Sequence, residues 1–131
     1  MDDHELIRRG FAAILATEPD LEVVGEASTR HEALELIAVT LPDVAVVDLR
    51  LPDGYGVAVC REIRERHEGV RCLMLTAFED EAALMDAVRA GASGYVLKDI
   101  DGTELVDAVR TIGRGGSLFD PAMVARANRD H

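Results

Sequence analysis

The sequence predicts an α/β domain in which a parallel sheet carries helices on both of its faces. Short apolar runs rich in Val and Leu alternate with longer segments of helical periodicity along the chain. Strict alternation of strands and helices favours parallel strands joined by helical crossovers, the doubly wound arrangement. With 131 residues, the chain has the length of one domain with a single core.

The clearest strand is predicted at residues 43–48. Its apolar run, residues 44–47, ends in Asp48, and a turn that contains Pro52 and Gly54 follows. An apolar run that leads into one carboxylate and then a turn is typical of a buried parallel strand. The other predicted strands are residues 21–25, 71–75 and 95–97.

Helical periodicity and end signals define the segments between the strands. Ser28 or Thr29 can cap one helix, Gly91 suits the left-handed position after another, and Pro121 suits a first turn. A glycine-rich stretch at 113–116 predicts a hinge before the last of them. The predicted helices are residues 4–17, 29–39, 55–66, 80–90, 102–114 and 119–128.

The composition of the chain argues against two classes of partner, nucleic acids and membranes. The formal net charge of -11 argues against a surface that grips nucleic acid, and it suits a Mg²⁺ ligand or a basic protein partner. No stretch approaches the roughly 20 apolar residues of a membrane span, and no signal peptide is visible. We therefore expect a soluble cytoplasmic protein with no membrane contact. Cys60 and Cys72 are too widely spaced for a metal site and are expected to be buried free thiols.

Polar residues stand at the ends of three predicted strands. Asp48, Thr76 and Lys98 follow successive strands, and Asp2 and Asp3 precede the first helix. In open α/β sheets the carboxyl ends of the strands form the ligand site. Carboxylates can hold Mg²⁺, a lysine can pair with a phosphoryl oxygen, and an aspartate can itself be the nucleophile. The set fits phosphoryl transfer onto Asp48.

Each of these residues also has a simpler interpretation. The N-terminal acids are of the type that caps or begins a helix, and Asp48 could cap a strand-to-turn junction. Thr76 could be an ordinary residue at a strand end, Tyr95 a core residue and Lys98 a solvated one. The chemical interpretation therefore depends on the whole set occurring together and in order.

Four sequence pieces, in order and at matching spacing, support that interpretation. They are residues 2–5 (Asp-Asp-His-Glu), 48–52 (Asp-Leu-Arg-Leu-Pro) with Gly56, 75–77 (Leu-Thr-Ala) and 91–98 (Gly-Ala-Ser-Gly-Tyr-Val-Leu-Lys). Here the chain resembles the receiver (CheY-like) domain of two-component response regulators, most closely the NarL/FixJ (LuxR-type) branch. The similarity runs from Asp2 to about Gly116 and implies a flavodoxin-like fold.

The resemblance implies a role for each residue of the site. Asp48 would accept a phosphoryl group from a sensor histidine kinase in the presence of Mg²⁺. Asp3 would bind the metal directly and Asp2 through water, with Asp48 and the backbone carbonyl of Arg50 as further ligands.

The resemblance also implies a switch. Lys98 and Thr76 would contact the phosphoryl group, and Tyr95 would swing inward behind it. This movement would repack the surface of the fourth helix, last strand and last helix, and so control formation of a homodimer. The domain would be a regulatory phospho-acceptor and not an enzyme, since its chemistry would be phosphotransfer to itself and self-dephosphorylation.

Members of this branch usually join the receiver to a helix-turn-helix that binds DNA. We expect residues 1–116 to form the receiver and 117–131 to be an extension toward an output domain, without direct nucleic acid binding by this domain. Lys98 precedes Asp99, where many receivers have proline, so the peptide bond between them is expected to be trans.

The first strand of the family has no counterpart, because no apolar run precedes the two N-terminal acids. In the family's 2-1-3-4-5 order that strand lies inside the sheet. Three explanations are open: an artefact of the chosen start, a domain that rearranges or borrows a strand from another copy, or a receiver that cannot be phosphorylated. We expect a marginally stable domain with weakened Mg²⁺ affinity.

Three alternative functions share features with this sequence. One is a receiver-derived dimerisation or docking module that works without phosphate. Another is a phosphatase resembling the haloacid dehalogenases, but that class needs a second aspartate where Arg50 stands. A cobalamin-binding domain needs a glycine at position 7, three residues after His4, and Ile7 stands there.

Overall fold

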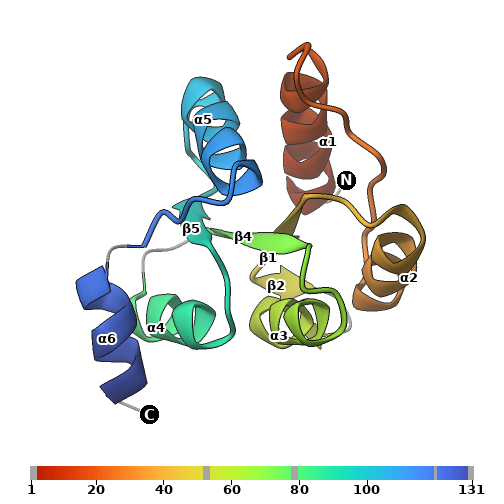
Figure 1. Cartoon of the computed structure of the whole chain (residues 1–131). Coiled ribbons are helices and arrows are strands. Elements are labelled where there is room, and N and C mark those ends of the chain that lie inside the picture. Colours follow the sequence, from red (N-terminus) through yellow and green to blue (C-terminus); the bar gives the residue numbers. More distant parts are fainter. Residues whose placement is uncertain (1–2, 52–53, 78–79, 120, 130–131) are drawn as a thin grey trace.

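The computed structural model describes residues 3–51, 54–77, 80–119 and 121–129, apart from the side chains of residues 3, 4 and 128. Helices and strands alternate along most of the chain (Figure 1). The helices are α1 (Asp3–Ala16), α2 (Arg30–Thr40), α3 (Gly56–Arg66), α4 (Glu81–Arg89), α5 (Gly102–Gly113) and α6 (Pro121–Arg129). The strands are β1 (Val44–Asp48), β2 (Arg50–Leu51), β3 (Gly54–Tyr55), β4 (Arg71–Thr76) and β5 (Gly94–Leu97).

The main sheet is parallel and has the order β1-β4-β5. Helices α1 and α5 lie on one face, and α2, α3 and α4 lie on the other (Figure 1). Parallel strands buried on both faces have continuous apolar sequences, and residues 72–76 of β4 are all buried. The predicted α/β class with a doubly wound parallel sheet is therefore confirmed.

The core has two layers because helices cover both faces of the sheet. One cluster joins the sheet to α3 and α4 and contains Val47, Ile63, Met74 and Ala87. The other is centred on Leu73 and four α5 residues, with α1 residues at its margin. Cys60 and Cys72 lie in the first cluster as buried free thiols, as predicted.

The predicted cap at Thr29 is present, and Asp80 caps α4 in the same way. The Thr29 hydroxyl accepts a hydrogen bond from the Glu32 amide at 3.2 Å, and the Asp80 carboxylate accepts one from the Ala82 amide at 2.9 Å. Gly91 follows Ala90, the C-cap of α4, and adopts a φ of 93°, a conformation in which glycine has no Cβ penalty. The described part of the chain contains no cis peptide bond, in agreement with the expectation for Lys98 and Asp99.

The prediction of a strand at residues 21–25 is wrong. Residues 21–27 have no regular secondary structure, and Val23 and Val24 are 37% and 45% exposed. Within the described residues, no strand pairs with this segment, and β1 forms the edge of the sheet. A strand needs a neighbour for its backbone hydrogen bonds, so β-favouring residues alone did not make one here.

Two structural features were not predicted. Strands β2 and β3 form a short antiparallel ladder in which Arg50 pairs with Tyr55 and Leu51 with Gly54. Helix α6 packs against α4 instead of continuing away from the domain (Figure 1). Among the described helices, none combines the length with the apolar character that a membrane span needs.

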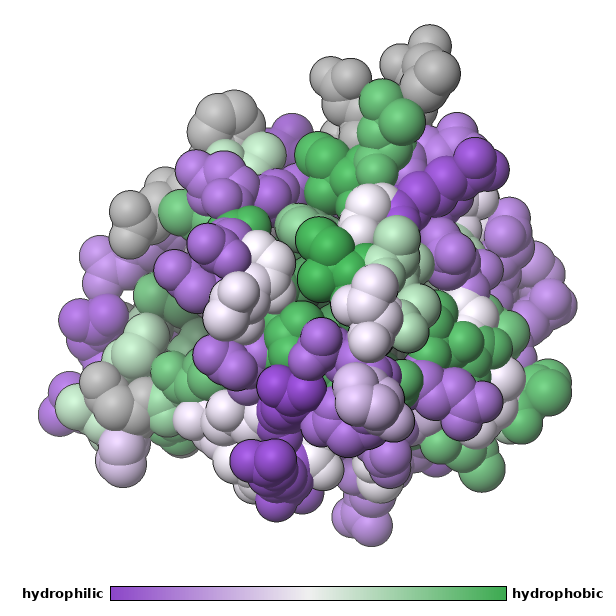
Figure 2. Space-filling view, turned by 90° about the horizontal axis from the view of Figure 1, so that it is seen from above, coloured by the Kyte–Doolittle hydropathy of each residue, from purple (hydrophilic) through white to green (hydrophobic). Residues whose placement is uncertain are grey.

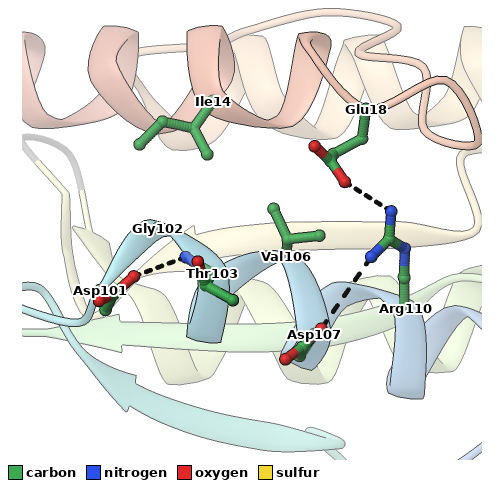
Figure 3. A pocket seen from close by; sticks show the side chains of 8 residues that line it. All are labelled: Ile14, Glu18, Asp101, Gly102, Thr103, Val106, Asp107 and Arg110. Carbon is green, nitrogen blue, oxygen red and sulfur yellow. Dashed lines mark hydrogen bonds and ion pairs between the residues drawn. The ribbon is translucent and has the colours of Figure 1, made fainter.

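An arginine on α5 ties this helix to the turn after α1 (Figure 3). Arg110 donates to Glu18 at 2.6 Å, the contact drawn in Figure 3. It also donates to both carboxylate oxygens of Asp20 at 2.8 Å. These charge-assisted hydrogen bonds hold the pKa of Asp20 below its ordinary value of 3.8 and raise the pKa of Arg110. The cluster anchors a helix that has no buried side chain among its described residues 5–16.

We expect Arg110→Met to lower stability at neutral pH but not in acid. Because the folded pKa of Asp20 is depressed, its stabilisation is present above the unfolded value and is lost as the pH falls through the folded value. Thermal melts of wild type and variant should therefore converge in acid, whereas Arg9→Met should show little difference at any pH. Equal melting temperatures of wild type and Arg110→Met at neutral pH would contradict this account.

Candidate functional site

The predicted site residues meet at the carboxyl edge of the sheet. Asp48 ends β1, Thr76 ends the adjacent β4, and Lys98 follows β5. The hydrogen bonding between β4 and β5 continues one residue past the end of β5, because the Lys98 amide donates to the Thr76 carbonyl at 2.7 Å. Parallel pairing thus places three residues that are far apart in sequence side by side, as the sequence predicted.

An ion pair forms the centre of the site. The Lys98 ammonium lies 2.5 Å from Oδ2 of Asp48, and Oδ1 accepts a hydrogen bond from the Arg50 amide at 3.1 Å. The side chains of Lys98 and Asp48 are 7% and 21% exposed. Partial burial strengthens the attraction between the charges, and the exposed part of the carboxylate leaves it accessible to a small reactant.

Of the two predicted switch residues, Thr76 ends the strand beside Asp48, and Tyr95 lies on β5, three residues before Lys98. Thr76 is 3% exposed and is the one polar residue classed as buried in the part of the chain that the structure describes. Tyr95 lies opposite Met74 in the β4–β5 register and packs against the core cluster on the α3 and α4 side. Strands β4 and β5 therefore connect the site at their carboxyl ends to the apolar core on the α4 side of the sheet.

Gly56 has a role in the site that its sequence context did not explain. The first residue of α3 approaches the end of β1 so closely that a Cβ on Gly56 would overlap the Asp48 carbonyl and lie 2.9 Å from Cα of Leu49. Its amide donates to the Leu49 carbonyl at 2.7 Å. Gly56 therefore positions the backbone that carries Asp48, a contact that only the folded structure reveals.

The metal ligands predicted with the site are described only in part. Asp2 and the side chain of Asp3 lie outside the described residues, although the backbone of Asp3 begins α1. Among the described residues, no group of three His, Cys, Asp or Glu side chains could hold a metal ion. The Asp48 carboxylate and the Arg50 carbonyl are oxygen donors of the kind that Mg²⁺ prefers, and the Arg50 peptide adjoins that carboxylate.

A hollow between α1 and α5 is separate from this site. It has a volume of about 310 Å³, and Ile14, Gly102, Val106 and Arg110 contribute to its walls (Figure 3). The view onto this face shows apolar residues in a band between polar ones (Figure 2). None of the predicted site residues that the structure describes lines the hollow, so the strand-end cluster remains the candidate functional site.

Comparison with known proteins decides the family. The family model of the response regulator receiver domain matches residues 1–110. The chain belongs to this family. The receiver is 50% identical over 120 residues to the DNA-binding transcriptional activator DevR/DosR of Mycobacterium tuberculosis, covering 92% of the chain and 55% of that protein. It is 35% identical over 126 residues to the response regulator protein VraR of Staphylococcus aureus, covering 96% and 60%.

Solved structures agree with this assignment. A LuxR-family two-component response regulator from Aurantimonas superposes with a TM-score of 0.83 at 36% identity, over 98% of this receiver and 92% of that chain. The isolated receiver of RcsB from Salmonella enterica serovar Typhimurium, with phosphomimetic BeF₃⁻, gives 0.80 at 25% identity, over 96% and 93%. These findings confirm the predicted resemblance to LuxR-type receivers and the CheY-like fold. The receiver spans about half the length of the curated relatives it matches.

Proposed function

We propose that this receiver is a phosphorylation-dependent switch in which Asp48 accepts a phosphoryl group from a sensor histidine kinase. The observation that carries the proposal is the ammonium of Lys98 at 2.5 Å from the Asp48 carboxylate. Thr76 supplies a hydroxyl at the end of the neighbouring strand. A nucleophilic carboxylate, a fixed cation and a hydroxyl at one sheet edge are the groups that phosphoryl transfer needs.

In the transfer step, an oxygen of Asp48 attacks the phosphorus of a phosphohistidine. The new O–P bond forms as the N–P bond breaks, and the departing imidazole keeps the electron pair and takes a proton. Each carboxylate oxygen starts with a hydrogen-bond partner, and an oxygen that accepts one hydrogen bond keeps a lone pair for the attack. Lys98 can then follow the charge to a phosphoryl oxygen, since a lysine ammonium has three donors on a flexible stem.

A divalent cation would complete the site. Asp48, the Arg50 carbonyl and the acids Asp2 and Asp3 would hold Mg²⁺, which would neutralise charge on the phosphoryl oxygens. The oxygen donors of the described residues suit this ion. The chain's own contribution is to fix the carboxylate between Lys98 and the Arg50 amide, so that little reorganisation precedes the attack.

The phosphoryl group would act on the rest of the domain through Thr76 and Tyr95. A charged group placed on Asp48 attracts the Thr76 hydroxyl, and the space that it leaves admits Tyr95 from the α4 side. Such a local charge change can bias a two-state packing arrangement. We propose that the resulting surface controls a homodimer and a DNA-binding output outside this domain, in the cytoplasm, without enzymatic turnover of an external substrate.

The proposal is tested by intact mass after incubation with acetyl phosphate and Mg²⁺. We expect one phosphoryl adduct in the wild type and none in Asp48→Asn, because an amide cannot accept the group. Asp43→Asn is the matched control, since Asp43 is an exposed acid just before the same strand, and it should retain the adduct.

Two results would contradict the proposal. An equal adduct in Asp48→Asn would place the chemistry on another residue. No adduct in a folded wild type at saturating acetyl phosphate and Mg²⁺ would favour the phosphate-independent docking module.

A further inference from the structure

Helix α6 binds back onto the domain through α4. The Arg89 guanidinium of α4 donates to the Ala127 carbonyl at 3.1 Å, and Arg126 pairs with Glu81 at 2.8 Å. Ala127 is fully buried, so a small side chain allows the two helices to approach closely. The structure thus holds α6 by polar contacts on both sides of a tightly packed alanine.

The surface beneath α6 is a regular helix face. Glu81, Met85 and Arg89 are spaced four residues apart and therefore lie in one row along α4. The outer two bind α6, and the central Met85 is 5% exposed. This arrangement is a helix-binding surface with an apolar centre and a charged residue at each end.

Charge complementarity explains why α6 is the occupant. The last turn of α6 contains Arg126 and Arg129, whereas α4 contributes Glu81 and Asp86. Arg126 pairs with Glu81 across the two helices, whereas Asp86 is bonded to Arg89 of its own helix. Opposite charges at a helix interface favour one partner and one orientation.

The segment leading into α6 touches the strand that carries the predicted switch. The Leu118 amide donates to the Ser93 carbonyl at 2.8 Å, directly before β5. Phe119, 8% exposed, lies in the same apolar cluster against which Tyr95 packs, and that cluster also contains Leu49, next to Asp48. Tyr95 and Phe119 thus belong to one close-packed cluster, and close-packed interiors transmit displacements.

We propose that α6 is an internal ligand of the α4 surface, and that its docking and the phosphorylation of Asp48 oppose one another. The inference rests on the proposed function. Docked α6 holds α4 and β5 in the arrangement of this structure. Inward movement of Tyr95 weakens the contact between α6 and α4. Released α6 leaves the row around Met85 open. Thermodynamic linkage is reciprocal, so a receiver that cannot dock α6 must bind a phosphoryl group more readily.

The reciprocal effect is measurable with Ala127→Glu. A glutamate at this fully buried position is too large to be accommodated with α6 docked. We expect the apparent Kd for beryllofluoride, with Mg²⁺ present, to fall about fivefold or more. The amide resonance of Thr76 reports binding. Ala125→Glu, an exposed site on the same helix, is the matched control and should bind like the wild type.

Two variants at exposed positions separate the undocking of α6 from misfolding of the domain. Glu81 is 70% exposed, so Glu81→Arg should leave the fold intact while it repels Arg126. We expect a smaller fall in Kd, about twofold, and a return to the wild-type value in Glu81→Arg with Arg126→Glu. In the wild type, beryllofluoride should also speed hydrogen exchange of the α6 amides.

The outcomes distinguish this inference from the proposed function. Tight binding of beryllofluoride that is the same in wild type, Ala127→Glu and Glu81→Arg would overturn the coupling and leave the switch intact. Binding in none of the folded variants would overturn the proposed function and the inference with it. Weaker binding in Ala127→Glu would mean that docked α6 supports phosphorylation, which contradicts the stated sign.

Discussion

Gly56→Ala is expected to destabilise the receiver by about 3 kcal/mol, at the upper end of the range for overpacking. A methyl group at this position would overlap the Asp48 carbonyl and press on Cα of Leu49, and both obstacles are backbone. Backbone at the end of a buried strand cannot rotate away as a flexible side chain can. The start of α3 must move instead, and with it the loop that positions Asp48. Urea unfolding measures the loss, and phosphoryl incorporation should fall together with stability.

Gly10→Ala provides the contrast within the same protein. Gly10 lies in α1 and is exposed, and a Cβ at this position would meet no described atom outside its own helix within 4 Å. Alanine there should stabilise the domain by about 0.5–1 kcal/mol, because glycine inside a helix is entropically unfavourable. A Gly56→Ala variant as stable as the wild type would contradict the close approach of α3 to β1.

Lys98→Ala is expected to lower the free energy of unfolding by about 3 kcal/mol and to abolish efficient phosphoryl transfer. Removing the ammonium leaves the Asp48 carboxylate, 21% exposed, without its principal countercharge. Loss of the same cation removes the group that would stabilise the transferred phosphoryl oxygens. Chemical unfolding and intact mass measure the two effects on one sample.

The double variant separates the pair interaction from loss of packing. Lys98→Ala with Asp48→Ala should recover part of the lost stability, since no unpaired charge then remains at the sheet edge. Arg66→Ala is the matched surface control, because Arg66 is 66% exposed and pairs with Glu62 at 3.4 Å. It should change stability by less than about 1 kcal/mol. A loss in Lys98→Ala no larger than in this control would show that the central ion pair is unimportant for folding.

Local periodicity predicted most of the fold because strands and helices here have strong, contiguous patterns. The boundaries of β1, β4 and β5 differ from the predictions by one residue or less. The segment 21–25 failed because a strand also depends on a partner elsewhere in the sheet, and pairing is not encoded by the segment itself. The contact of α6 with α4 was missed for a similar reason, since nothing near Ala127 in sequence indicates what covers it.

The sequence predicted which residues form the candidate site, but not the contacts between them. Three polar residues at strand ends converge in any parallel sheet, so the meeting of Asp48, Thr76 and Lys98 followed from topology. The bond from Lys98 to one carboxylate oxygen, and the Arg50 amide on the other, depend on loop geometry that the sequence does not reveal. The close approach at Gly56 is a backbone contact without any side-chain signal.

The account is tested most directly by locating the phosphoryl group on the chain. An acyl phosphate on aspartate is reduced by borohydride to homoserine, a stable mark that peptide mass spectrometry assigns to one position. After treatment with acetyl phosphate and Mg²⁺, the account predicts homoserine at position 48 and at no other acidic residue. Homoserine elsewhere, with Asp48 unmodified, would contradict the assignment of Asp48 as the phospho-acceptor.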